Sequence, residues 1–101
     1  MFTKFDWEER YRYYQFKRPD GQDGLATGEV LASVDSVTCF EITSPYLDCS
    51  ATMISNVAIY SSTQVTYLLK AGETGKNYLI TVKATTTLGQ KLEGTVNIGI
   101  T

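Results

Sequence analysis

Histidine is absent from the 101 residues of this chain, and that absence excludes a large part of enzyme chemistry. Histidine is the commonest general base in active sites and the commonest protein ligand of transition metals. Catalytic triads and Cys-His pairs are therefore ruled out. The carboxylates Asp20, Asp23 and Glu29 lie in a turn-rich stretch, where charged side chains are ordinarily solvated. We therefore expect no enzyme, no catalytic residue and no cofactor.

Soft metal ligands are also scarce, because the only cysteines are Cys39 and Cys49. Two thiols without histidine do not complete a four-ligand zinc site. The loop Asp20–Gly24 offers oxygen atoms but lacks the bidentate glutamate of a calcium loop. The segment 72–76 lacks the spacing of a phosphate-binding loop and reads as a turn. We therefore expect no metal or phosphate site.

Long hydrophobic runs are missing as well. The first residues contain no apolar segment typical of a signal peptide. The sequence also contains no run of about 18 apolar residues, the length that a membrane-spanning helix needs. These absences predict synthesis in a cytoplasm and no membrane partner. In that reducing compartment the two cysteines are expected to stay free.

Net charge is low, at −2, so the chain as a whole has little attraction for nucleic acid. The charge is nevertheless uneven. Residues 1–18 carry five basic and three acidic side chains, whereas residues 19–101 carry four lysines and eight acids. Seven of the twelve aromatic residues also fall in residues 1–18. We therefore divide one domain into an aromatic and basic N-terminal segment (1–18) and a β-domain (19–101).

The β-domain is predicted from a period of two in the apolar residues. One strand alternates through Val65 and Tyr67, and after a turn framed by Gly72 and Gly75 a second alternates from Tyr78, which suggests a hairpin. A last strand over residues 91–101 follows a turn at Gly89 and is expected to pair with the strand before it.

Two further strands precede these. The first begins at Glu29 and alternates Val30, Ala32 and Val34 on one face, then continues past a bulge or turn at Asp35-Ser36. The second covers residues 52–62 and follows Ser44-Pro45, where proline stops ladder pairing.

Six or seven short strands in a chain of this length predict an all-β fold, an immunoglobulin-like sandwich of about seven antiparallel strands. A sheet with one apolar face must bury that face against a second sheet. A closed barrel is the alternative.

The N-terminal segment fits two local structures. Asp6 and Glu9 have the spacing of a helix capping pair, and Trp7, Tyr11 and Tyr14 share one helical face, which predicts a short helical turn. The alternation around Tyr11 equally suits a first strand.

The same segment contains the candidate partner-binding residues, since aromatic side chains and arginine are enriched at interface hot spots. The alternative is that the aromatics, with Phe16, close the open end of the core. Stacking of single-stranded nucleic acid is disfavoured by the acidic net charge. The candidates are Trp7, Arg10, Tyr11, Arg12 and Tyr14.

Tyr78 is a structural candidate together with the turn glycines Gly72, Gly75 and Gly89. A tyrosine at the start of a strand, just after a glycine-rich turn, is typical of a tyrosine corner. In that arrangement the hydroxyl bonds to the backbone a few residues upstream.

Two stretches resemble a family of small phage- and prophage-encoded immunoglobulin-like proteins. They are Leu25–Ser33, preceded by Tyr14-Gln15-Phe16, and the region Gly72–Gly89 with its Gly-x-x-Gly-x-x-Tyr pattern. The resemblance implies a non-enzymatic virion structural or accessory protein of the head, the head–tail junction or the tail. It would bind other virion subunits, with self-association also open, and reside in the virion after assembly. The alternative is a free-standing binding module for a carbohydrate or a host protein.

Overall fold

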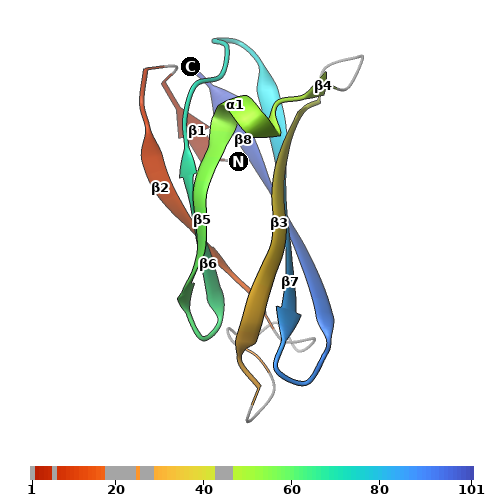
Figure 1. Cartoon of the computed structure of the whole chain (residues 1–101). Helices are drawn as coiled ribbons and strands as arrows, with labels where there is room; N and C mark the ends of the chain where they lie inside the picture. The colour runs from red at the N-terminus through yellow and green to blue at the C-terminus, as the bar shows by residue number, and fades with distance from the viewer. Residues whose placement is uncertain (1, 6, 18–24, 26–28, 43–46) are drawn as a thin grey trace.

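The structure is a computed structural model that describes residues 2–5, 7–17, 25, 29–42 and 47–101. The predictions made for Asp6, for the loop 20–24 and for Ser44-Pro45 lie outside these residues. The described part is mostly β, with two sheets and one short helix, as Figure 1 shows. None of its helices is long and apolar enough to cross a membrane.

The larger sheet has five strands in the order β1-β8-β7-β3-β4 (Figure 1). Only the pairing of β1 with β8 is parallel, and the other neighbours are antiparallel. The sheet is therefore mixed. In chain order its strands are β1 (Phe2–Lys4), β3 (Leu31–Glu41), β4 (Leu47–Asp48), β7 (Asn77–Thr86) and β8 (Lys91–Ile100).

The smaller sheet is antiparallel and has three strands in the order β2-β6-β5. They are β2 (Arg10–Gln15), β5 (Ile54–Ser61) and β6 (Gln64–Leu69). The helix α1 (Ser50–Met53) is a single turn that leads from β4 in the large sheet into β5 in the small one.

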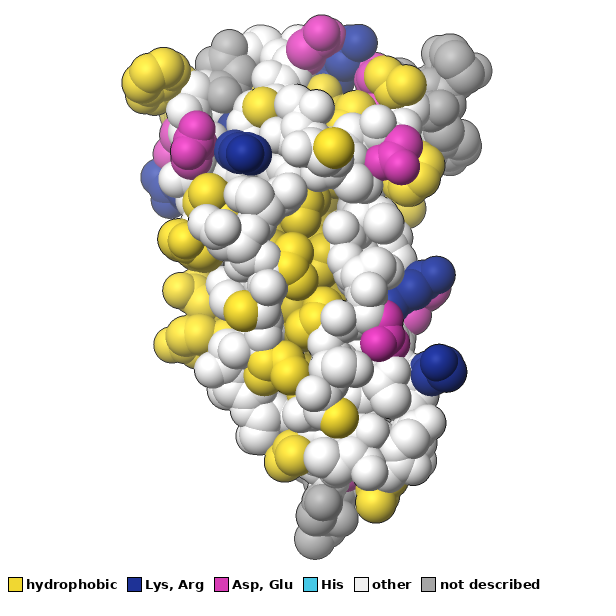
Figure 2. All heavy atoms as spheres, viewed as in Figure 1, with side chains coloured by type: hydrophobic (Ala, Val, Ile, Leu, Met, Phe, Trp, Pro, Cys, Tyr) yellow, Lys and Arg dark blue, Asp and Glu magenta, His cyan; other side chains and the backbone are white. Residues whose placement is uncertain are grey.

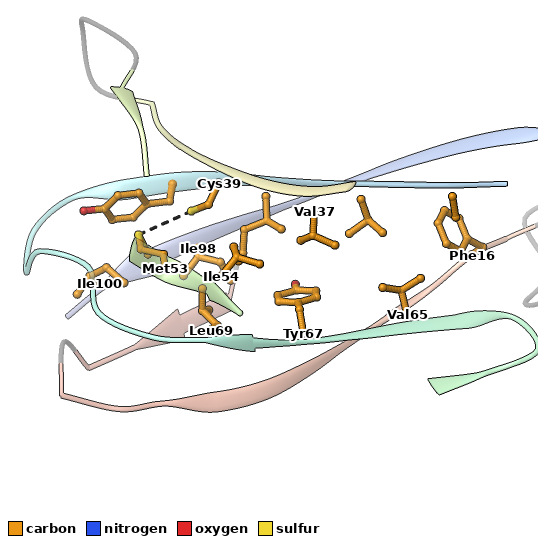
Figure 3. Packing of buried hydrophobic residues seen from close by; sticks show 14 of the residues in the cluster. Phe16, Val37, Cys39, Met53, Ile54, Val65, Tyr67, Leu69, Ile98 and Ile100 are labelled. Atoms are coloured by element: carbon orange, nitrogen blue, oxygen red, sulfur yellow. Dashed lines mark hydrogen bonds between the residues drawn. The ribbon is translucent and has the colours of Figure 1, made fainter. Parts of the chain in front are cut away.

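The core lies between the two sheets and runs along their length, from Ile100 and Met53 at one end to Phe16 at the other (Figure 3). The predicted alternation is confirmed in β6 and β7, where every second side chain is buried. At about 25 cal/mol per Å² of apolar surface, this burial is the main stabilising term of such a small domain. The alternating core residues of these strands are Val65, Tyr67, Leu69, Tyr78, Ile80, Val82 and Ala84.

The predicted bulge at Asp35-Ser36 is present, because the register of β3 against β7 shifts between Val34 and Ser36. A second shift between Leu31 and Ser33 was not expected. Each inserted residue reverses which face the following side chains point to. The expectation that Val30, Ala32 and Val34 share one face is therefore wrong: Val30 and Ala32 are exposed, whereas Val34 packs against the core, and Leu31 is buried.

The predicted hairpin between β6 and β7 is also wrong, because these strands belong to different sheets. A period of two shows that a strand buries one face but not which sheet it joins. Residues 70–76 instead cross from one sheet to the other, with Ala71 at φ 57° and Gly72 at φ 97°. The antiparallel neighbours that are consecutive in the chain are β3 with β4, β5 with β6, and β7 with β8.

Tyr78 stabilises the connection between the two sheets through a hydrogen bond to its backbone. Its hydroxyl oxygen accepts the backbone N–H of Glu73 at 3.0 Å, five residues upstream, while the side chain is 3% exposed. Burial raises the pKa of the Tyr78 hydroxyl, so it stays protonated. A side chain at Gly72 would be strained, because φ is positive and an added Cβ would lie 2.9 Å from the side chain of Ile100, which would have to move. Gly75 and Gly89 also have positive φ.

Both cysteines are free. Cys39 is fully buried, with its Sγ 3.7 Å from the Sδ of Met53 (Figure 3). Burial raises the pKa of Cys39 to about 12, so its thiol is protonated at neutral pH. The backbone N–H of Cys49 donates a hydrogen bond to the carbonyl of Cys39 at 2.8 Å. The side chain of Cys49 is partly exposed.

Candidate partner-binding surface

The strand β2 sorts the N-terminal aromatic residues onto two faces. Tyr14 lies opposite the buried Val65 of β6, so it points to the inside of the sandwich. Tyr11 and Tyr13 lie opposite Leu68 and Thr66 and point outward, because successive side chains of a strand alternate. Residues 10–15 therefore form a strand, and the predicted helical turn through Tyr11 and Tyr14 is wrong.

Three tyrosines and an asparagine meet on the outer side of the small sheet, and we call them the tyrosine face: Tyr11, Tyr13, Tyr60 and Asn56. The rings of Tyr13 in β2 and Tyr60 in β5 lie 4.5 Å apart between centroids, across β6. Asn56 in β5 donates its side-chain N–H to the hydroxyl of Tyr11 at 3.1 Å. The three tyrosines are 51–61% exposed.

The composition of this face suits protein recognition. Residues 49–69, which contribute α1, β5 and β6, include no charged side chain. Tyrosine offers a large rigid ring with a hydrogen-bonding tip and loses little conformational entropy on binding. The tyrosine face is therefore an uncharged, aromatic surface of the kind found at the centre of protein interfaces.

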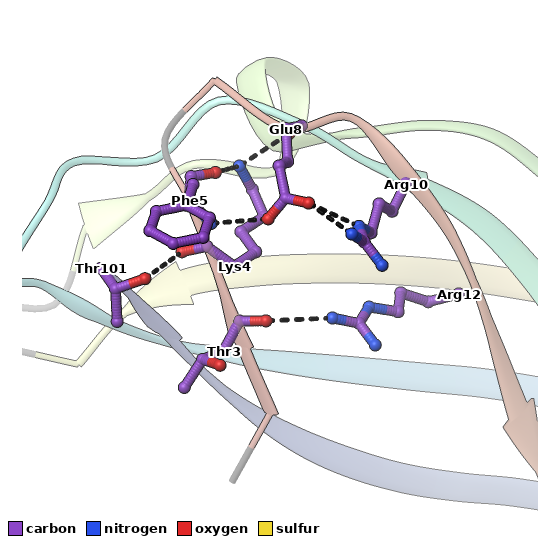
Figure 4. Close-up of polar contacts among 7 residues, drawn as sticks. All are labelled: Thr3, Lys4, Phe5, Glu8, Arg10, Arg12 and Thr101. Carbon is purple, nitrogen blue, oxygen red and sulfur yellow. Dashed lines mark hydrogen bonds and ion pairs between the residues drawn. The ribbon is translucent and has the colours of Figure 1, made fainter.

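A separate polar cluster holds the loop between β1 and β2 (Figure 4). Glu8 accepts the backbone N–H of Phe5 at 2.9 Å and the Nε–H of Arg10 at 2.7 Å. These two donors hold the pKa of Glu8 below its ordinary value. The side chain of Lys4 is 2% exposed and donates to the carbonyls of Phe5 and Glu8. The backbone N–H of Thr101 donates to the carbonyl of Lys4, which ties this end to the C-terminus.

Trp7 points outward from this loop between β1 and β2, and 90% of the residue is exposed. A cavity of about 620 Å³ lies beside it, lined by Trp7, Arg10, Lys70 and Ala71 together with two glutamates. An exposed tryptophan next to a cavity is a strong candidate anchor, because tryptophan leads the residues enriched at binding hot spots. The alternative that Trp7 closes the core does not hold.

Arg12 spans the edge of the sandwich. Its Nη2 donates to the carbonyl of Thr3 at 3.3 Å, so it joins β2 in the small sheet to β1 in the large one (Figure 4). A cavity of about 230 Å³ at this edge is lined by Tyr11, Arg12, Tyr13, Tyr67 and Val96. Arg12 therefore contributes to the fold as well as to the surface.

The structure thus separates the five sequence-predicted residues. Trp7 and Tyr11 are exposed, and the side chain of Arg10 is 61% exposed while paired with Glu8. Tyr14 instead packs into the core edge-on to Phe16, with 4.9 Å between ring centroids. Tyr14 and Phe16 therefore pack in the core, as the alternative interpretation of the segment predicted for both residues.

Sequence reasoning missed Tyr13, Tyr60 and Asn56 as parts of the surface. Tyr60 and Asn56 come from a strand that β6 separates from β2, and no local pattern predicts that neighbourhood. A signal for Tyr13 was present, since arginine and tyrosine alternate through residues 10–13. The helical spacing of Trp7, Tyr11 and Tyr14 obscured it.

A small two-sheet β-domain that leaves aromatic side chains exposed has the features of a protein that binds other macromolecules. The sequence model of one family, described as "Podophage GP4 fiber-tail adaptor protein gp77", matches residues 9–99. The chain belongs to this family, and it is a tail-associated structural component of a phage virion. No curated protein and no solved structure matches the chain.

The match confirms the resemblance to phage virion proteins and the prediction that the chain is not an enzyme. Among the head, head–tail and tail locations left open by the sequence, it selects the tail. An adaptor between tail and fibres binds other virion proteins, and the exposed surfaces described above are candidates for that binding.

Proposed function

We propose that the chain contributes to fibre attachment by docking the tyrosine face and Trp7 onto another protein of the phage tail. The observation that carries this proposal is the exposure of Trp7, Tyr11, Tyr13 and Tyr60, which are among the large hydrophobic side chains that this small domain leaves exposed. Large aromatic side chains gain the most from burial, so leaving four of them exposed in a virion protein favours their burial at an interface.

A few residues contribute most of the binding free energy of an interface. Truncation of a hot-spot aromatic residue costs about 2–4 kcal/mol of binding free energy, whereas most contacts in an interface cost little. The loop that carries Trp7 is closed by the hydrogen bond from the Phe5 N–H to Glu8, and Tyr11 accepts a hydrogen bond from Asn56. Such preorganisation lowers the entropy lost on binding.

We further infer that the sandwich is immunoglobulin-like. In that fold one sheet contains strands in the order G, F, C and C′, and the other contains B, E and D. The orders β8-β7-β3-β4 and β2-β6-β5 correspond strand for strand. Tyr78 then occupies the tyrosine corner at the start of strand F. The residue two positions later, where antibody domains have a disulfide cysteine, is the buried Ile80.

The proposal also covers the assembly of the chain. After synthesis in the host cytoplasm the chain would join the tail, with contacts to other tail proteins and between its own copies. A carbohydrate-binding module remains the second candidate, because an uncharged face of tyrosine and asparagine could also stack on a sugar. Family membership favours the protein partner.

The experiment uses a phage that lacks this gene and is complemented with variants of the full chain. We expect Trp7→Ala and Tyr11→Ala to lower the number of copies in gradient-purified particles at least tenfold. Leu88→Ala is the matched control, since Leu88 is 65% exposed at the turn between β7 and β8. Normal incorporation of both aromatic variants would refute the proposed surface. Normal incorporation with loss of adsorption to the host glycan would favour the carbohydrate alternative.

A further inference from the structure

The strand β5 has an edge that differs from every other sheet edge in the described residues. The terminal strands β1 and β4 have three and two residues, and β2 carries Arg10 and Arg12. The part of β3 that β4 does not cover carries Asp35 in a bulge, and the part of β8 that β1 does not cover carries Lys91 and Glu93. Short length, charge and bulges are the means by which proteins prevent sheet edges from pairing with other chains.

The strand β5 has eight residues, no charge and no proline, and among the described strands it pairs only with β6. Its residues 57–60 are exposed one after another, including Val57 at 40%, Ile59 at 38% and Tyr60 at 61%. A strand that only covers a core buries every second residue. We call Val57, Ala58 and Ile59 the β5 edge patch.

The surface next to this patch is apolar as well. Figure 2 shows hydrophobic side chains in a column along the gap between β5 and β3, where the two sheets come together at one side of the sandwich. Charged side chains lie at the ends and outside of this column. A further strand against β5 would therefore cover apolar surface and satisfy backbone groups together.

The bulge in β5 limits where such a strand can pair. Asn56 has φ 52°, and the register against β6 shifts between Ser55 and Ala58 and again between Ile59 and Ser61. A bulge bends a strand and interrupts the ladder. The edge available for pairing is consequently the short stretch after Asn56, which contains the β5 edge patch.

We propose that this edge pairs with β5 of a second copy of the chain. Two antiparallel β5 strands related by a two-fold axis would join the small sheets into one six-stranded sheet. A two-fold contact places a patch against itself, so any charge in it would face a like charge. The β5 edge patch lies in the charge-free stretch 49–69 and meets its copy without that cost. Interfaces between identical subunits are also the more apolar class.

The pairing is tested at Val57 and Ala58 in β5, whereas the docking on the tail is tested at Trp7 and at Tyr11 in β2. Either proposal can therefore fail while the other holds. The test is sedimentation equilibrium of the purified full chain over the micromolar to millimolar range. We expect a monomer–dimer equilibrium. Val57→Lys and Ala58→Lys should each raise the dimer Kd at least tenfold, because each places two lysines close together across the axis. Leu88→Lys adds the same charge at an exposed leucine in the turn between β7 and β8 and should leave the Kd within about twofold.

Circular dichroism and thermal melts establish that each variant is folded, and Ala58→Lys suffices if Val57→Lys is not. Amide hydrogen exchange at residues 57–61 should slow as the concentration of the wild-type chain rises, with no change at β2. A monomer at every concentration, a dimer that neither lysine variant weakens, or an open-ended oligomer would overturn the proposal.

Discussion

Replacing Gly94 by alanine tests the placement of Tyr14, on which the division between core and partner surface depends. Gly94 lies in β8 opposite Val82, and an added Cβ would overlap Cζ and Oη of the Tyr14 ring. Tyr14 thus reaches from the small sheet across to the large one, and glycine leaves room for its ring.

The magnitude follows from two opposing effects. An extra methyl group in a packed core costs about 1–3 kcal/mol, whereas alanine in a strand is more favourable than glycine by about 0.5–1 kcal/mol. Gly94→Ala should therefore destabilise the wild-type chain by about 1 kcal/mol. In a Tyr14→Ala background the overlap is gone, and the same change should stabilise the protein by about 0.5–1 kcal/mol.

The assay is a double-mutant cycle of chemical denaturation on the four proteins. The coupling between Gly94 and Tyr14 should be about 1–3 kcal/mol, since residues in direct contact are not additive. If Gly94→Ala has the same effect with and without the Tyr14 ring, Tyr14 does not lie on β8. It would then return to the candidates for partner contact.

Three further predictions concern single side chains. Tyr78→Phe should lower the unfolding free energy by about 1 kcal/mol, because the hydrogen bond from the Glu73 N–H is lost. The control Tyr60→Phe should change the unfolding free energy by less than about 0.5 kcal/mol. Equal effects in urea denaturation would contradict the tyrosine corner at Tyr78. The pKa of Glu8 is lowered in the folded state, so its stabilising contribution is present above its unfolded pKa, ordinarily 4.5, and is lost as pH falls through the folded value. The difference in melting temperature between wild type and Glu8→Gln should therefore shrink below pH 4.5. A constant difference would argue against the hydrogen bonds of Glu8 with Phe5 and Arg10. In the native protein a thiol reagent at pH 8 should modify Cys49 quickly and Cys39 only after unfolding; equal rates would mean that Cys39 is not enclosed.

The sequence predicted the strands well where burial on one face is uninterrupted. In β6 and β7 the alternation from Val65 and from Tyr78 appears unchanged in the structure. It failed in β3, because two extra residues reverse the faces and nothing in the composition of residues 31–36 marks both bulges.

The pairing of strands was less accessible, as the error at residues 70–76 shows. The two interpretations of that stretch were in conflict, because a tyrosine corner at Tyr78 belongs to a connection between sheets and a hairpin stays within one. The hydrogen bond from Glu73 to Tyr78 and the separate sheets of β6 and β7 agree with each other.

The candidate surface could be predicted only in part for a related reason. Trp7 and Tyr11 stood out by composition, because aromatic residues are concentrated near the N-terminus. Their neighbours Tyr60 and Asn56 are 45 or more positions away from Tyr11 and reach it only through the order β2-β6-β5. A surface assembled from separate strands requires the topology first.

The most direct test of the account is hydroxyl-radical footprinting, read by mass spectrometry, of the chain free in solution and in intact phage particles. Trp7, Tyr11 and Tyr13 are at least half exposed in the free chain and should be oxidised readily there. In particles their oxidation should fall several-fold, while Leu88 keeps its rate apart from any general shielding. Equal oxidation of Trp7 and both tyrosines in the free and particle-bound chain would contradict the claim that this surface holds the adaptor on the tail.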